Sequence, residues 1–130
     1  MNRRTELTRL AYGSTLMDGG YTLWEDDTPR YKGFVVGGIA HESKCKRTDY
    51  AQFAKLFEDY RDILRTDPRN IGKLTGLGTW HEDDKIYFDI VQLCDTREEA
   101  VKWCKFYGEK AYFDIVAQKS IYLYEITNER

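Results

Sequence analysis

The chain has few of the residues that carry metal or redox chemistry. It contains three cysteines and two histidines among 130 residues, and no Cys-x-x-Cys spacing occurs. This number and spacing argue against a disulfide framework and against a zinc site. We expect Cys45, Cys94 and Cys104 to be reduced, with two of them packed in the core. A reactive thiol is an alternative at Cys45, because the cations beside it in the sequence would favour the thiolate.

Long apolar runs and a strong net charge are lacking as well. The longest apolar stretch, residues 33–40, is far too short to span a bilayer, and no apolar segment follows the arginines near the N-terminus. We therefore expect a cytoplasmic protein without a membrane partner. The net charge is -2, which is too small to favour nucleic acid as a partner.

The most informative feature that is present is a near repeat. Residues 85–91 read Lys-Ile-Tyr-Phe-Asp-Ile-Val, and residues 110–116 read Lys-Ala-Tyr-Phe-Asp-Ile-Val, 25 residues further on. A helix fits between the two copies, so they predict a βαβ unit whose two strands pair in parallel.

Two helices have clear signals. Apolar residues recur at spacings of three and four from Tyr50 to Leu64, and Asp67-Pro68 ends that helix. The second helix begins at a capping box, Thr96 to Glu99, and Gly108 stops it.

The other elements are predicted from alternation and turn residues. Residues 1–130 form one domain, in which 1–19 are a loosely ordered segment with at most a short helix over 5–12. Residues 20–24 and 31–40 predict a hairpin, and Gly37-Gly38 predicts a bulge in its second strand. A second hairpin joins 77–80 to 85–93, and the last strand covers 121–126. The predicted fold class is α+β, a single mostly antiparallel sheet with two helices on one face, in the order ββαββαββ.

The repeated Tyr-Phe-Asp triplet supplies candidate functional residues. Alternation places the Phe-Ile sides of both copies under the helices, so Tyr87, Asp89, Tyr112 and Asp114 would share the open face of the sheet. Two close carboxylates can act as an acid/base pair or hold a divalent cation, yet no further catalytic residue accompanies them. Tyrosines suit protein interfaces, which is the reading we favour over catalysis. The alternative is two similar strands with ordinary half-solvated faces.

Acidic residues cluster at 25–27 and again in the turn Glu82-Asp83-Asp84. They are either turns kept in water or a polar contact surface for a protein partner. We include Glu82, Asp83 and Asp84 with the triplet residues as candidate partner-binding residues. We predict no catalytic residue, no metal and no cofactor.

Several short motifs together resemble a group of small uncharacterised proteins of phages and prophages. The motifs are Gly78-Thr-Trp80, Lys85-Ile-Tyr-Phe-Asp89, Asp95-Thr-Arg-Glu-Glu-Ala100 and Gly108-Glu-Lys-Ala-Tyr-Phe-Asp114. The residues 20–23 and 33–36 also resemble the N-terminal hairpin of that group. The likeness covers roughly residues 19–126, and the chain departs from it at residues 117–120. The resemblance implies an accessory viral gene without catalytic residues.

We therefore predict a non-enzymatic phage or mobile-element protein that binds a host protein as a counter-defence inhibitor, in the manner of anti-CRISPR proteins. The alternative is an oligomeric small-molecule or nucleotide-signal sponge, in which Arg69, Asn70, Lys73 and Gly37-Gly38 would serve phosphate groups. An aromatic content of 15% further predicts a homodimer that uses the open sheet face or the edge of the last strand.

Overall fold

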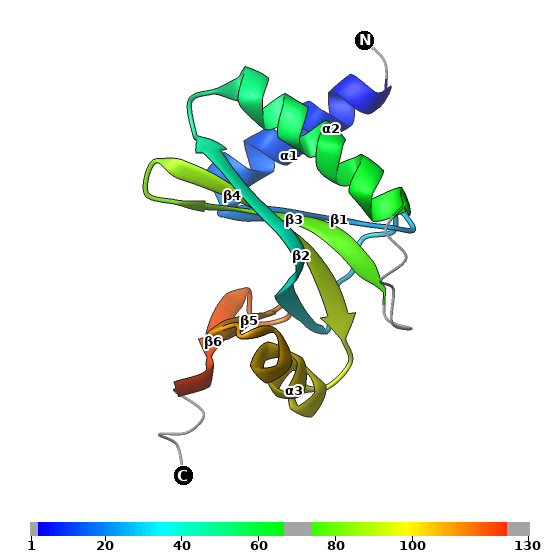
Figure 1. Ribbon diagram of the computed structural model, residues 1–130, viewed down its shortest axis with the longest axis vertical. Coiled ribbons are helices and arrows are strands. Elements are labelled where there is room, and N and C mark those ends of the chain that lie inside the picture. Colours follow the sequence, from blue (N-terminus) through cyan, green and yellow to red (C-terminus); the bar gives the residue numbers. More distant parts are fainter. Residues whose placement is uncertain (1–2, 67–73, 125–130) are drawn as a thin grey trace.

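A computed structural model describes residues 3–66 and 74–124, with the backbone alone for residues 3–4 and 39–41 (Figure 1). The chain is α+β with a single antiparallel sheet, as predicted. Its elements in order are α1 (Arg3–Asp18), β1 (Gly20–Trp24), β2 (Phe34–Lys46), α2 (Tyr50–Thr66), β3 (Thr75–Glu82), β4 (Lys85–Cys94), α3 (Arg97–Tyr107), β5 (Ala111–Asp114) and β6 (Lys119–Tyr122).

The N-terminal segment is a 16-residue helix, so the prediction of a loosely ordered stretch with a short helix is wrong. The helix packs on the core through Thr8, Ala11 and Thr15, which are all buried. Two of these three residues are threonines, and the larger apolar residues beside them, Leu7, Tyr12 and Leu16, are only partly buried, so the helix has a weak amphipathic pattern. The element order is αββαββαββ, one helix more than predicted.

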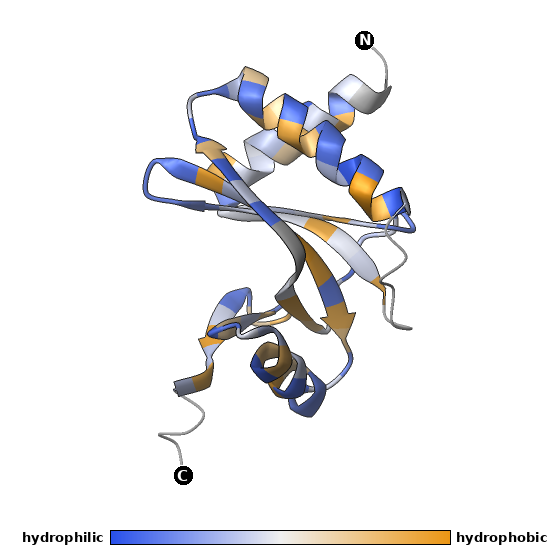
Figure 2. Ribbon diagram, viewed as in Figure 1, coloured by the Kyte–Doolittle hydropathy of each residue, from blue (hydrophilic) through white to orange (hydrophobic). Residues whose placement is uncertain are grey.

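The two helices predicted in the middle of the chain are confirmed. In α2 the buried face is Phe53, Phe57 and Tyr60, and Figure 2 shows apolar bands alternating with polar ones along this helix. In α3 the side chain of Thr96 accepts a hydrogen bond from Glu99 N at 3.2 Å, and Gly108 ends the helix with a left-handed φ of 73°.

The strands lie in the order β1-β3-β4-β2-β5-β6, and every neighbouring pair is antiparallel. The β3–β4 hairpin is confirmed. The hairpin predicted from residues 20–24 and 31–40 is wrong, because β1 pairs with β3, and both β3 and β4 separate it from β2. Residues 26–29 do form a turn, in which Asp26 accepts a hydrogen bond from Thr28 N at 3.0 Å. The turn begins the connection from β1 to β2, which are not neighbours in the sheet.

The repeated segments belong to β4 and β5, which share one sheet and run parallel to each other. They are not neighbours, however, because β2 lies between them and pairs antiparallel with both. The predicted parallel pairing is therefore wrong, and β4-α3-β5 is a βαβ unit split by an inserted strand. Antiparallel ladders on both sides of β2 are slightly more stable per residue than a parallel pair.

The insertion of β2 is accompanied by a large bulge. The 13 residues of β2 lie opposite the 10 residues of β4, and the three extra residues fall between Val36 and Glu42. Gly38 within this bulge has a left-handed φ of 76°. Because the number of extra residues is odd, even-numbered side chains before the bulge and odd-numbered side chains after it lie on the same side of the sheet. Val36 packs in the cluster under α3, whereas Cys45 packs in the cluster under α2.

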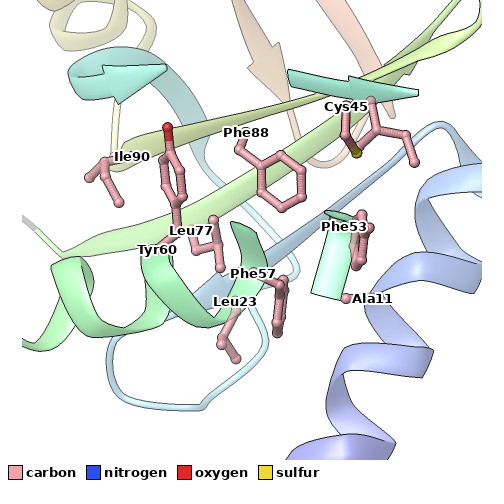
Figure 3. Packing of buried hydrophobic residues seen from close by; sticks show 10 residues of the cluster. Ala11, Leu23, Cys45, Phe53, Phe57, Tyr60, Leu77, Phe88 and Ile90 are labelled. Carbon is pink, nitrogen blue, oxygen red and sulfur yellow. The ribbon is translucent and has the colours of Figure 1, made fainter. Parts of the chain in front are cut away.

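The main core lies between α1, α2 and the strands β3 and β4 (Figure 3). The ring of Phe88 on β4 lies 5.1 Å from that of Phe53 and 5.6 Å from that of Tyr60. A second, smaller core under α3 contains Cys94, which alternation places on the same side of β4 as Phe88. Three helices therefore cover that side, α1 and α2 at one end of the strands and α3 at the other, instead of the two that the sequence predicted.

Candidate functional site

The opposite side of the sheet, called here the open face, carries an aromatic pair. Cross-strand register forms a row from β1 to β2 that consists of Gly20, Trp80, Tyr87 and Lys44. The rings of Trp80 and Tyr87 are stacked, with centroids 5.3 Å apart and an interplanar angle of 13°. Both side chains are half-exposed, and Gly20 places no side chain beside the indole.

The acidic turn lies beside this row, where β3 and β4 join two residues beyond Trp80. Glu82, Asp83 and Asp84 are exposed, and Asp83 adopts a left-handed φ of 57° that the short polar side chain tolerates. The carbonyl of Asp84 accepts a hydrogen bond from Arg47 N at 2.8 Å, which fixes the turn to the end of β2. Glu82 is two residues from Trp80 and therefore on the same face. The structure thus brings together four of the seven predicted site residues, Tyr87 and the three acids.

The other three predicted residues are buried. Tyr112 is 2% exposed and packs edge-to-face on Phe34, with centroids 5.7 Å apart, in the cluster under α3. Asp114 is 7% exposed, and its Oδ1 accepts from Ala117 N at 3.1 Å. The prediction that Tyr112 and Asp114 lie on the open face is wrong, because Phe34 lies opposite both Asp114 and Cys94, and residues of one cross-strand row share one side of the sheet. Tyr112 and Asp114 therefore lie on the side that the helices cover.

The prediction that the carboxyl groups of Asp89 and Asp114 lie close together is also wrong. Asp89 lies opposite Glu42, whereas Asp114 lies opposite Phe34 near the other end of β2, and β2 separates the two strands. These two residues are therefore not an acid/base pair.

Asp89 is sealed beneath the bulge of β2 and is 1% exposed. Gly38 N donates a hydrogen bond to Asp89 Oδ2 at 2.7 Å, and within the described part of the chain Asp89 Oδ1 has no hydrogen-bond partner. The position that a Cβ of Gly37 would occupy is 2.4 Å from Asp89 Oδ2 and 3.1 Å from Glu109 Oε1. The two carboxyl groups therefore both border the space that a side chain at position 37 would fill.

Burial raises the pKa of Asp89 to about 8, and the nearby carboxylates of Glu109 and Glu42 act in the same direction. The pKa of Glu109 is raised as well, first by burial and then by Glu42. Asp89 is therefore mostly protonated at neutral pH. A neutral carboxyl costs far less to bury than an ionised one, which explains how this residue is tolerated inside.

The same carboxyl groups argue against phosphate at Gly37-Gly38. Asp89 already takes the N–H of Gly38, and Glu109 would repel an anion there. The other residues named for a phosphate site, Arg69, Asn70 and Lys73, lie outside the described residues.

All three cysteines are free, as predicted, and all three are buried, whereas two were predicted to be buried. Burial raises the pKa of Cys45, with Asp49 as a second cause, so the alternative of a reactive thiolate there is wrong. In residues 3–66 and 74–124 no group of three His, Cys, Asp or Glu side chains is arranged to hold a metal ion.

Trp80 is the residue of the open face that was missed among the candidates. The signal was available, because the predicted β3–β4 hairpin makes an aromatic residue on each strand a cross-strand neighbour once the turn length is known. A two-residue turn at Asp83 and Asp84 sets the register that pairs Trp80 with Tyr87.

A comparison of this chain with protein-family models, curated proteins and solved structures finds no match. None of the helices in the described part of the chain is long and apolar enough to cross a membrane.

Proposed function

We propose that this chain is a non-enzymatic accessory protein of a phage or mobile element that binds a host protein and inhibits a host defence, in the manner of anti-CRISPR proteins. The observation that carries the proposal is the stacked pair of Trp80 and Tyr87 on the open face, with the acidic turn and Lys44 beside it. The resemblance to small phage and prophage proteins supplies the biological setting.

The aromatic pair has the properties of an interface anchor. Trp and Tyr are enriched among the residues that contribute most to binding, usually inside a polar rim. The two rings are already stacked on paired strands, so little side-chain entropy remains to be lost when a partner covers them. Glu82 and Lys85 on one side and Lys44 on the other supply charges of both signs around the rings.

The structural use of the triplet carboxyls supports a non-enzymatic role. Asp89 holds the bulge through Gly38, and Asp114 holds the β5–β6 turn through Ala117. Each carboxyl thus has a role in the fold, which is a sufficient reason for its presence. A homodimer is also part of the proposal, with the edge strand β6 (Lys119–Tyr122) as its contact. The strand predicted over 121–126 overlaps β6 at residues 121–122, whereas residues 123–124 are helical and 125–126 lie outside the described residues.

The proposal is tested by expressing the chain in a bacterial host with an active CRISPR system and measuring the plating efficiency of a targeted phage. We expect the wild-type chain to restore plating, and Trp80→Ser with Tyr87→Ser to lose at least about tenfold of that gain, the usual effect of removing an interface anchor. Tyr31→Ser is the matched control, because Tyr31 is 81% exposed and lies away from the pair in sequence.

Purified defence complex is then mixed with each purified variant, so that a loss of plating can be assigned to lost binding. If the wild-type chain neither restores plating nor binds the complex, this class of target is wrong. If the double variant acts as well as Tyr31→Ser, the open face is not the contact surface.

A further inference from the structure

The strand β1 lies at one edge of the sheet and pairs, among the described strands, only with β3. Two backbone hydrogen bonds bracket this pairing, His81 N to Gly19 O and Glu25 N to Thr75 O, each at 2.9 Å. In an antiparallel pair the backbone groups of alternate residues point to the same side. The N–H and C=O groups of Gly20 and Thr22 therefore point away from the sheet.

Exposed acids stand at both ends of this edge. Asp18 precedes β1, and Glu25, Asp26 and Asp27 follow it. Two of these groups have local tasks: Asp26 pairs with Arg30 at 2.5 Å, and Glu25 Oε1 accepts from Thr75 N at 3.1 Å. Asp18 and Asp27 form no ion pair with other described residues. One uncompensated negative charge thus remains at each end of the edge.

We propose that the β1 edge binds an extended segment of a partner protein that carries basic residues at both ends, and that this segment adds a strand to the sheet. The outward backbone groups of Gly20 and Thr22 would supply the main-chain hydrogen bonds, and Asp18 and Asp27 would pair with the cations. This inference deepens the proposed function by naming the chemistry of the partner, and it rests on that function.

Electrostatic repulsion argues against a second copy of the chain as the partner that binds the β1 edge. Two β1 edges related by a two-fold axis would run antiparallel, so Asp18 of each copy would meet the acids that follow β1 in the other. Like charges placed directly opposite each other destabilise a strand pair. Acids beside an exposed edge are a usual means of blocking self-association.

The open face explains how such a segment can be selected by its side chains. The added residue opposite Gly20 would extend the row of Trp80 and Tyr87 by one strand. Because Gly20 has no side chain, a long side chain from that residue can reach across toward the indole of Trp80. An arginine or lysine would gain a cation–π contact there.

The test uses a synthetic nine-residue probe with two lysines at each end and five alternating Val and Thr residues between them. Its control has glutamates in place of the lysines. Calorimetric titration should show binding of the lysine probe alone, with an affinity that falls as salt is added. Amide hydrogen exchange at Thr22 should slow when the lysine probe is bound.

Two sets of variants separate the backbone and charge contributions. Thr22→Pro removes an outward N–H that β3 does not use, and Thr22→Ala keeps it, so we expect at least about tenfold weaker binding for the proline variant. Asp18→Asn with Asp27→Asn removes both charges, and asparagine tolerates the left-handed φ of 59° at position 27. We expect a similar loss for this pair.

If Thr22→Pro fails to fold, the double variant Asp18→Asn with Asp27→Asn and the glutamate probe still test the proposal. Equal binding of the two probes, or undiminished binding by the asparagine pair, would overturn the proposal. Failure of the probe while the wild-type chain still restores phage plating would refute the edge site alone. Failure of plating while the probe binds would refute the proposed target and leave the edge site standing.

Discussion

Gly38 donates its backbone N–H to the buried carboxyl of Asp89 at 2.7 Å, and this contact joins the bulge of β2 to the centre of β4. The bond runs between residues 51 positions apart in the chain. The carboxyl of Glu109, which follows α3, lies close to the same two glycines. A single glycine pair thus lies where β2, β4 and the end of α3 meet, and its small size is what allows the three segments to approach.

The first prediction concerns the pH dependence of stability. The pKa of Asp89 is raised from 3.8 to about 8, so the folded state holds a proton that the unfolded state releases. The corresponding stability is fully present below about pH 4 and is lost as pH rises through about 8. We expect the free energy of unfolding, measured with urea, to fall between pH 5 and pH 8.

Asp89→Asn is the control for that measurement. The amide oxygen keeps an acceptor for Gly38 N, while the titrating group is removed. We expect a flatter pH profile for the variant. The contribution of the histidines to the pH dependence is the same in both proteins, so it cancels in the difference between the two profiles. Superimposable slopes for the wild type and the variant would mean that Asp89 does not carry the effect.

The second prediction concerns the space at Gly37. A Cβ at this position would lie 2.4 Å from Asp89 Oδ2, so Gly37→Ala must displace the buried carboxyl. We expect a loss of about 1–3 kcal/mol in the free energy of unfolding, the usual cost of overpacking. Gly13→Ala in the middle of α1 is the matched control, because nothing lies within 4 Å of its Cβ position. That variant should gain about 0.5–1 kcal/mol from helix propensity. Equal effects of the two alanines would contradict the close approach.

The third prediction compares two phenylalanines. Phe88 is fully buried between Phe53 and Tyr60, whereas Phe106 on α3 is 73% exposed. We expect Phe88→Ala to cost about 3–5 kcal/mol in thermal or chemical unfolding. Phe106→Ala should stay within about 0.5 kcal/mol of the wild type. A large cost at Phe106 would show that its ring is covered in solution, for example by a partner copy.

The fourth prediction tests the proposed dimer at β6. Leu123 N donates to Lys110 O at 2.9 Å, so the backbone groups of Ser120 alternate to the outer side of the strand. Sedimentation velocity at low micromolar concentration should show a species of twice 15.3 kDa for the wild type. Ser120→Pro should convert it to monomer, while Ser120→Ala should not. A wild-type species near 15.3 kDa would rule the dimer out.

The sequence identified those elements whose signals are local. The helix from Tyr50 is marked by large apolar residues at helical spacing, α3 by its capping residues, and the β3–β4 hairpin by a polar turn between alternating strands. The helix α1 was not recognised because its fully buried residues are Thr8, Ala11 and Thr15, and its larger apolar residues do not form a clear stripe at helical spacing. The strand order was not predicted correctly, because it depends on contacts between distant segments, which no local pattern encodes.

The candidate site was predicted in part for the same reason. Tyr87 and the acidic turn belong to the hairpin, and alternation placed them correctly on the open face. The identical triplet at Tyr112 was assigned to the wrong face, because no local pattern reveals the register in which Phe34 lies opposite both Cys94 and Asp114. Two similar segments therefore have opposite environments: Phe88 is buried in one, and Tyr112 is buried in the other.

The position of β2 between the repeated strands has a consequence for how the chain folds. Phe34, near the start of this strand, must meet both Cys94 and Asp114, which are synthesised long after it. Until then its backbone groups have no partner, and the nascent chain exposes an unpaired strand rich in apolar residues. Sheets closed by such distant pairings form slowly and are prone to aggregate before they close. Expression of this protein should therefore depend on the last two strands, and truncation after α3 should leave a chain that needs a chaperone to stay in solution.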